Sequence, residues 1–167
     1  FKGSVYEGKI YLVNIRKTEI LGFKAYQTIE QIPEMVDLAV IATPAKTVPE
    51  VVEHCGKAKI KGIIIISAGF KEIGPEGEAL KDKILEIKRK YGLRIIGPNC
   101  LGVIHPSINL NATFINRMPK PGNIAFISQS GALGSAILDW AIYENVGFSN
   151  FVSVSSMIDV DFGDLID

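Results

Sequence analysis

Residues 124–133 read Ile-Ala-Phe-Ile-Ser-Gln-Ser-Gly-Ala-Leu, an apolar run followed by a small polar turn and the start of a helix. The run Ile124–Ile127 is typical of a strand covered on both faces, as in a parallel sheet. The turn Ser128-Gln129-Ser130-Gly131 opens the helix, so the free N–H groups of the first helical turn point beyond the strand end. Because the helix dipole adds to their positive potential, we interpret Ser130 and Gly131 as a phosphate site rather than a plain helix cap.

The alternation of apolar runs and amphipathic stretches continues in both directions from this segment. Further strands are predicted at Ile10–Val13, Leu38–Ala42, Ile63–Ile66, Arg94–Ile96 and Phe151–Val154. Strands that alternate with helices indicate an α/β fold of the doubly wound kind, with a parallel sheet.

Three helices are predicted between these strands. The first starts at Thr47-Val48-Pro49-Glu50, which has the pattern of a capping box, and buries a face formed by Val48, Val51, Val52 and Cys55. The second spans Pro75–Tyr91 before the stop residue Gly92, and its inward face comprises Leu80, Ile84, Ile87 and Tyr91. The third begins near Gly131 and carries Leu133, Ile137 and Trp140 on one face.

The segment 116–123 interrupts the alternation. It contains Met118-Pro119-Lys120-Pro121-Gly122, and two prolines with a glycine favour neither a strand nor a helix. We therefore expect a domain boundary near Pro121, with one domain over residues 1–120 and a second over residues 121–167.

Composition excludes several classes of function. The 167 residues include 18 basic and 18 acidic ones, and this zero formal charge argues against a nucleic-acid or membrane-surface partner. No apolar run approaches the roughly 20 residues that span a bilayer. We see no secretory signal, and Cys55 and Cys100 have neither metal nor redox spacing, so a cytoplasmic location is expected. His54 and His105 lack a partner at metal spacing, so we predict no metal site.

The turns after the predicted strands are small or polar. They read Val13-Asn14, Ala42-Thr43-Pro44, Ser67-Ala68-Gly69-Phe70, Gly97-Pro98-Asn99-Cys100 and Ser128-Gln129-Ser130-Gly131. Ligands of open parallel sheets bind beyond the carboxyl ends of the strands, and small residues let a ligand reach backbone N–H and C=O groups. We therefore expect the five turns to gather along one edge as a ligand cleft. Arg16 and Lys17 could meet phosphates of an extended cofactor there, although such residues taken alone are more often solvated surface charges.

In this order, the turns resemble those of the ADP-forming acyl-CoA synthetases, relatives of the succinyl-CoA synthetase α subunit. The more specific blocks are Gly97–Gly102 and Gly122–Leu133, and Ile65–Glu72 supports them. The resemblance covers nearly the whole chain. It implies a Rossmann-like CoA-binding domain, whose first strand and glycine-rich loop would precede Phe1, followed by the first part of a flavodoxin-like domain.

The resemblance also implies a reaction and its partners. Acyl-CoA, ADP and phosphate would be interconverted with acid, CoA and ATP through an acyl phosphate and a phosphohistidine. The histidine would follow Asp167, so we expect no catalytic residue in this chain and no activity of this chain by itself. ADP or ATP with Mg would bind a partner ATP-grasp β subunit or domain, and an oligomer is expected.

Carried over by motif, the site residues fall at the strand ends. The CoA contacts would be Val13, Asn14, Lys17, Thr43, Pro44, Ser67, Ala68, Gly69 and Asn99, and phosphate would bind Ser130 and Gly131. Two departures concern Ile15, where the family commonly has proline, and Ser155-Ser156, where it usually has a glycine-led turn. The serine turn leaves open the backbone geometry beside the phosphate site.

Two other functions stay open from the sequence. One is a non-catalytic CoA-binding or CoA-sensing module, as in fusions with an acetyltransferase. The other is a dinucleotide-binding oxidoreductase domain, which needs an acidic residue after its second strand where this chain has Val13-Asn14. The acyl group of the substrate cannot be read from these residues.

Overall fold

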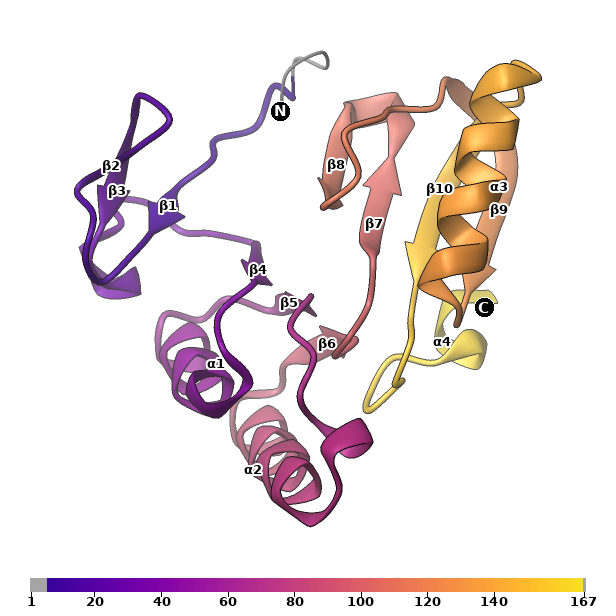
Figure 1. Cartoon of the computed structure of the whole chain (residues 1–167). Helices are drawn as coiled ribbons and strands as arrows, with labels where there is room; N and C mark the ends of the chain where they lie inside the picture. Colours follow the sequence, from indigo (N-terminus) through magenta and orange to yellow (C-terminus); the bar gives the residue numbers. More distant parts are fainter. Residues whose placement is uncertain (1–5, 167) are drawn as a thin grey trace.

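The computed structural model describes residues 6–166, which form three small sheets and their helices (Figure 1). The first sheet has the order β1-β3-β2, with β1 at Leu12–Val13, β2 at Glu19–Ile20 and β3 at Phe23–Tyr26. Strands β1 and β3 are parallel, and β2 and β3 form an antiparallel hairpin. The predicted strand at Ile10–Val13 is therefore confirmed only over its last two residues.

The second sheet is parallel throughout, with β4 at Leu38–Ile41, β5 at Gly62–Ile65 and β6 at Arg94–Ile96 in the order β4-β5-β6. Helices α1 (Val48–Lys57) and α2 (Pro75–Tyr91) connect these strands and lie on the same side of the sheet (Figure 1). The predicted parallel α/β arrangement is confirmed here. Short 3₁₀ helices lie at Ile29–Gln31, Ala45–Thr47, Lys71–Ile73 and Pro106–Ile108.

Alternation along β5 decides how this sheet is packed. Ile63 and Ile65 belong to the core beneath α1 and α2, which contains the buried helical residues Val52 and Ile84. Ile64 belongs to a different cluster, together with Cys100 and Ala112. Because successive side chains of a strand point to opposite faces, this unbroken apolar run covers both faces of the sheet.

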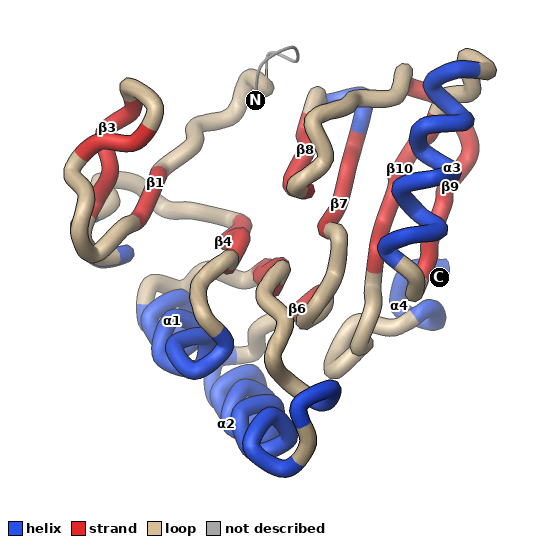
Figure 2. Tube along the Cα trace, viewed as in Figure 1, coloured by secondary structure: helices blue, strands red, loops and turns tan. Residues whose placement is uncertain are grey.

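The third sheet has the order β8-β7-β10-β9. Its strands are β7 (Gly102–His105), β8 (Leu110–Thr113), β9 (Pro121–Ser128) and β10 (Phe148–Ser153). β9 and β10 are parallel, whereas β7 pairs antiparallel with both β8 and β10. Helix α3 (Gly131–Tyr143) packs on this sheet, and the short helix α4 spans Phe162–Ile166 (Figure 2). The sheet thus combines strands from both sides of the expected domain boundary near Pro121.

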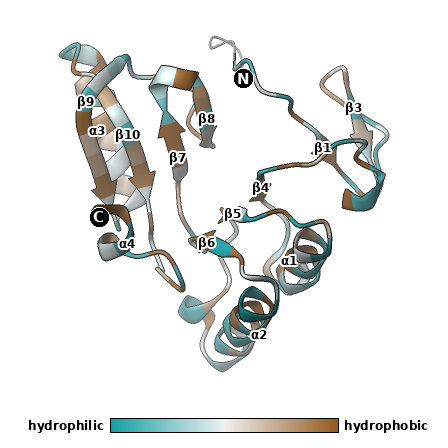
Figure 3. Ribbon diagram, turned by 180° about the vertical axis from the view of Figure 1, so that it is seen from behind, coloured by the Kyte–Doolittle hydropathy of each residue, from teal (hydrophilic) through white to brown (hydrophobic). Residues whose placement is uncertain are grey.

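Two local predictions in this region are wrong. Residues 121–123 form the start of β9 rather than an interruption, since proline is tolerated as the first residue of a strand. The buried face of α3 is formed by Gly134, Leu138 and Ala141. Of the predicted face, Ile137 packs against this core, whereas Leu133 and Trp140 are 55% and 54% exposed. A Cβ at Gly134 would lie 3.1 Å from Phe151 Cζ of β10. The helix therefore approaches the sheet at Gly134, where it carries no side chain. Figure 3 shows that α3 is largely apolar around its circumference, in contrast to the hydrophilic stretches of α2.

The capping box predicted at Thr47 does not form. The Thr47 hydroxyl donates to the Pro44 carbonyl at 2.8 Å and makes no cap hydrogen bond to the helix. The 3₁₀ turn Ala45–Thr47 leads directly into α1, and the Thr47 hydroxyl bonds to a residue that precedes it in the chain rather than to the helix that follows. The buried face of α1 is as predicted, with Val48, Val52 and Cys55 inaccessible to solvent.

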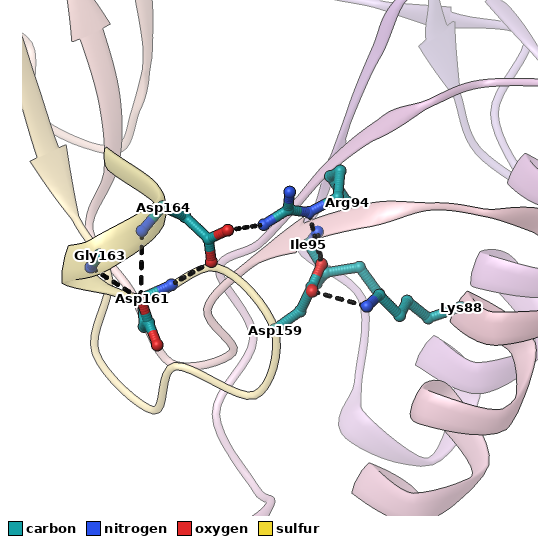
Figure 4. A network of polar contacts seen from close by, with 7 residues as sticks. All are labelled: Lys88, Arg94, Ile95, Asp159, Asp161, Gly163 and Asp164. Carbon is teal, nitrogen blue, oxygen red and sulfur yellow. Dashed lines mark hydrogen bonds and ion pairs between the residues drawn. The ribbon is translucent and has the colours of Figure 1, made fainter. Parts of the chain in front are cut away.

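The segment after β10 returns to the parallel sheet. Ile158 N–H donates to the Gly97 carbonyl at 3.4 Å, and Val160 N–H donates to the Ile95 carbonyl at 3.1 Å. The carboxylate of Asp159, 5% exposed, lies 2.8 Å from Lys88 Nζ and 3.3 Å from Arg94 Nε (Figure 4). These contacts connect the C-terminal part of the chain to β6 and α2. Within residues 6–166, no helix has both the length and the apolar character needed to cross a membrane.

Candidate functional site

Three of the predicted turns meet at the carboxyl ends of β4, β5 and β6. The Ser67 hydroxyl donates to the Thr43 carbonyl at 2.5 Å, and the Asn99 N–H donates to the Ser67 carbonyl at 2.9 Å. Thr43, Pro44, Ala68 and Asn99 are exposed, while Ser67 and Gly69 are half-buried. The parallel register therefore gathers polar groups from three separate segments at one accessible edge.

Backbone conformation shapes this edge. Gly69, Gly97 and Asn99 have φ values of +105°, +96° and +58°, so the turns after β5 and β6 pass through the left-handed region. A Cβ at Gly97 would lie 2.5 Å from the Ile65 carbonyl oxygen, so only glycine lets the third turn pack directly on the end of β5. The edge is thus formed by closely packed backbone with few side chains in front of it.

The turn after β1 belongs to a different sheet from these three turns. Asn14 Oδ1 accepts hydrogen bonds from the N–H groups of Arg16 and Lys17, both at 3.0 Å, and the amide closes its own local turn. Strand β1 pairs with β3 and β4 pairs with β5, and among residues 6–166 no strand pairing links β1 to β4. Strands β1 and β4 therefore belong to separate sheets, and a place for Val13, Asn14 and Lys17 along the same ligand cleft stays a prediction. Alternation of strands predicts sheet edges only when the strands share one sheet.

The turn after β9 likewise lies on a different sheet from the other three. Ser128 Oγ accepts from Ser130 N–H at 3.1 Å, and Ser130 Oγ accepts from Leu133 N–H at 3.2 Å, which makes Ser130 the N-cap of α3. The N–H groups in the first turn of a helix have no intrahelical acceptor, and they carry the positive end of the dipole. Ser130 thus caps a helix of 13 residues, and phosphate binding at Ser130 and Gly131 stays a prediction.

The segment 97–101 contacts both turns. Its Asn99 bonds to Ser67, as described above, and its Leu101 Cβ would lie 3.9 Å from a Cβ on Gly131. Leu101 N–H also donates to Ser153 Oγ at 3.1 Å, and Ser153 is fully buried at the end of β10. The strand-end turns and the start of α3 are therefore neighbours, although they belong to two sheets.

The sequence singled out Ser155-Ser156 only as a departure from the family's glycine-led turn, and the structure places the loop 155–158 against the turn after β6. Ser156 N–H donates to the Pro98 carbonyl at 3.4 Å, and Ser156, Met157 and Ile158 line a cavity of about 240 Å³. The same cavity is lined by Phe70 and Pro98, which lie directly beside the predicted CoA contacts Gly69 and Asn99. Ser155 and Met157 have φ values of +46° and +45°. A glycine at such a position predicts a positive φ, whereas serine and methionine do not.

The two thiols are unsuited to nucleophilic chemistry. Burial raises the pKa of Cys55 and of Cys100 to about 12, so both side chains remain protonated at neutral pH. Cys100 Sγ donates to the Ile65 carbonyl at 3.3 Å, a contact that fastens the third turn to β5. No three His, Cys, Asp or Glu residues within 6–166 cluster in a way that could hold a metal ion.

Comparison with known proteins gives the family. Residues 3–106 match the CoA binding domain family, and residues 121–167 match the succinyl-CoA ligase like flavodoxin domain. The ADP-forming acetate–CoA ligase II subunit alpha of Pyrococcus furiosus is 51% identical over 160 residues, which are 96% of this chain and 35% of that protein. The ADP-forming 4-hydroxybutyrate–CoA ligase of Nitrosopumilus maritimus is 40% identical over 90% of this chain and 22% of its own length.

A solved structure agrees with these relatives. The dinucleotide forming acetyl-coenzyme A synthetase 1 of Ca. Korarchaeum cryptofilum, in complex with phosphate and ADP, has a TM-score of 0.91 and 41% sequence identity. The match covers 98% of this chain and 35% of that one, so this chain spans about a third of the length of such relatives. The chain belongs to the CoA binding domain family, and it is homologous to the α subunits of ADP-forming acetate–CoA ligases.

Proposed function

We propose that this chain is the CoA- and phosphate-binding part of an ADP-forming acyl-CoA synthetase. The observation that carries the proposal is the position of segment 97–101, which contacts the strand-end turn of Ser67 and the start of α3 at Gly131. A thioester bound along the Ser67 turn would have its acyl carbon near an anion bound at the start of α3. The two regions expected from the sequence, 1–120 and 121–167, would each supply one of these sites; their end residues, Phe1 and Asp167, lie outside the described part.

In the proposed reaction, phosphate attacks the thioester carbonyl, the C–S bond breaks, and CoA leaves as the thiolate to give an acyl phosphate. The phosphoryl group then passes through a phosphohistidine outside this chain to ADP on an ATP-grasp partner. The work of this chain would be to position the reactants and to stabilise anionic oxygens. Thr43, Pro44, Ser67, Ala68, Gly69 and Asn99 would contact CoA, together with Val13, Asn14 and Lys17 from the separate first sheet, and Ser130 and Gly131 would hold the phosphate.

Calorimetric titration of CoA, with NAD as the control ligand, tests the cofactor. We expect CoA to bind and NAD not to bind, because no acidic residue follows β1 to hold a nicotinamide-dinucleotide ribose. Binding of NAD in place of CoA would remove the proposal and favour an oxidoreductase domain.

Phosphate titration of two serine variants tests the second site. Ser130→Ala removes the hydroxyl at the start of α3 and should weaken phosphate binding about tenfold, the effect of one lost hydrogen bond to an anion. Ser135→Ala is the matched control, since the Ser135 hydroxyl donates to Ala132 on the same helix and away from the turn. CoA binding without any phosphate binding would instead favour the non-catalytic CoA module.

A further inference from the structure

Glu72 lies beside the predicted CoA-contacting turn and is not part of the site as described so far. It belongs to the 3₁₀ helix Lys71–Ile73, directly after Ser67-Ala68-Gly69-Phe70. Its Oε1 accepts a hydrogen bond from the Gly69 N–H at 2.7 Å. Partial burial raises the pKa of the Glu72 carboxyl, but hydrogen bonds from the backbone N–H groups of Gly69, Glu72 and Phe70 outweigh burial, and the net pKa lies below its ordinary value. The carboxylate is therefore held against the turn by the Gly69 N–H hydrogen bond.

Packing fixes the turn on its other sides. A Cβ at Gly69 would lie 2.9 Å from the Ala45 Cβ, and a Cβ at Gly77 of α2 would lie 1.7 Å from the Phe70 carbonyl oxygen. Phe70 itself is 1% exposed. Gly69 has a φ of +105°, which leaves it many alternative conformations if its N–H loses its acceptor. The Glu72 carboxylate is thus a contact that fixes the conformation of Gly69, the glycine of this turn.

The same arrangement restricts what the turn can bind. Converging backbone N–H groups form an anion-binding nest, and in a CoA-binding protein such a nest would be a natural place for a phosphate of the cofactor. Here the Glu72 carboxylate already accepts the Gly69 N–H, and a second anion beside it would be repelled. The groups left to face a ligand are the exposed backbone of Ala68 and the hydroxyl and carbonyl of the Ser67–Thr43 contact, which are uncharged.

We propose that Glu72 is a positioning residue that holds the turn Ser67–Gly69 in shape for the uncharged part of CoA. This inference rests on the proposed function, because it takes the turn to be a CoA contact. In this arrangement the phosphates of CoA lie elsewhere, and the turn supplies hydrogen bonds to amide or adenine groups.

The sign of the change in affinity separates positioning from plain charge. CoA is a polyanion, so deletion of a nearby carboxylate that acts only through its charge would strengthen CoA binding. Deletion of a carboxylate that shapes the binding turn would weaken it. Glu76→Ala provides the charge control, since Glu76 lies in the first turn of α2 and its carboxylate pairs with Lys46 at 2.9 Å, whereas Gly69 N–H donates to Glu72.

The experiment is CoA and phosphate titration of the protein that carries this chain, with Glu72→Ala, Glu72→Gln and Glu76→Ala. We expect Glu72→Ala to weaken CoA binding about tenfold, as for one lost charge-assisted hydrogen bond. Glu72→Gln keeps an acceptor oxygen for Gly69 and should recover most of the affinity. Phosphate binding at Ser130 should be the same in all variants, which a general loss of structure would not allow.

The outcomes separate the inference from the function on which it rests. If the unsubstituted protein binds CoA and Glu72→Ala behaves like Glu76→Ala, or binds CoA more tightly, the positioning role is overturned and the proposed function stands. Equal losses for CoA and phosphate in Glu72→Ala and Glu72→Gln would also overturn it, in favour of a purely structural role. If the unsubstituted protein fails to bind CoA, the proposed function itself is lost and the inference goes with it.

Discussion

Asp159 accepts a hydrogen bond from the backbone N–H of Ile95 at 2.7 Å, and Val160 N–H donates to the Ile95 carbonyl at 3.1 Å. The segment after β10 thus pairs with the free edge of β6 as another strand would, with a carboxylate in place of one carbonyl. Ile95 is fully buried and Asp159 is 5% exposed (Figure 4). Since β6 leads directly into segment 97–101, this pair fixes the part of the chain that joins the two candidate binding sites.

Asp159→Ala should lower the free energy of unfolding by about 2–3 kcal/mol. The change leaves the buried Ile95 N–H without an acceptor and separates Lys88 and Arg94 from their shared carboxylate. Asp159→Asn retains an acceptor oxygen and should cost about half as much. Urea unfolding measures both. Asp139→Ala is the control, because Asp139 and Arg117 form an exposed pair whose loss should cost less than about 1 kcal/mol; an equal loss in all three variants would contradict the bridging role of Asp159.

Ser155→Gly should stabilise the protein by about 0.5–1 kcal/mol. Ser155 has a φ of +46°, a conformation that costs an L-residue about 1–2 kcal/mol of backbone strain. Glycine removes this strain, but it loses more conformational entropy on folding, so the net gain is smaller. The family resemblance led us to expect a glycine in this turn, and the structure retains the left-handed backbone without one. Ser156→Gly is the comparison, since Ser156 does not have a positive φ and glycine there should be destabilising. Thermal unfolding of the two variants should therefore shift in opposite directions.

Glu30→Gln should reduce the loss of stability in acid. Glu30 Oε1 lies 2.5 Å from His54 Nδ1, and chiefly this contact lowers the pKa of Glu30 from 4.5 to about 2. A carboxyl with a depressed folded-state pKa contributes stability above pH 4.5, and this contribution disappears as the pH falls through about 2. Urea unfolding at pH 5 and pH 2 should show the two proteins converging at the lower pH. His54→Gln removes the partner and should shrink the same pH-dependent difference; a difference that persists in this variant would place its cause elsewhere.

Ser130→Ala should cost about 1 kcal/mol of stability in addition to its effect on phosphate binding. The Ser130 hydroxyl accepts from Leu133 N–H at 3.2 Å, and loss of an N-cap typically costs this amount. Ser135→Ala should be neutral or slightly stabilising, because alanine has the higher helix propensity within α3. Chemical unfolding distinguishes the two; equal values would show that the Ser130 cap does not support the helix.

Local pattern predicted the parallel sheet well and the hairpins poorly. Ile63–Ile66 and Pro75–Tyr91 were predicted because a buried strand and a long amphipathic helix have distinct periods. The hairpin β2–β3 was missed because its turn uses Leu21 and Gly22, with φ values of +52° and +81°. Such turns are normally signalled by asparagine or aspartate before glycine, and leucine in that position looks like part of a strand.

The sequence likewise predicted part of the candidate site and missed the rest. The sequence placed Thr43, Ser67 and Asn99 at the ends of successive strands, and the structure brings these three together by hydrogen bonds. It also placed Asn14 in the same row, where the structure keeps β1 in a different sheet. Glu72 and Asp159 left no signal, because an isolated carboxylate in a polar stretch looks the same whether it faces solvent or a backbone amide.

By itself, the sequence determined the parallel β4-β5-β6 unit, the helices α1 and α2 that cover it, and the start of α3 at Gly131. These depend on periodicity, helix stops and turn residues, which act over a few neighbouring positions. Only the tertiary structure decided that β7 and β8 share a sheet with β9 and β10, and that residues 156–160 return to β6. Such pairings join residues far apart in the chain through backbone N–H and C=O groups, which nearly every residue carries. The identities of the side chains therefore do not predict them.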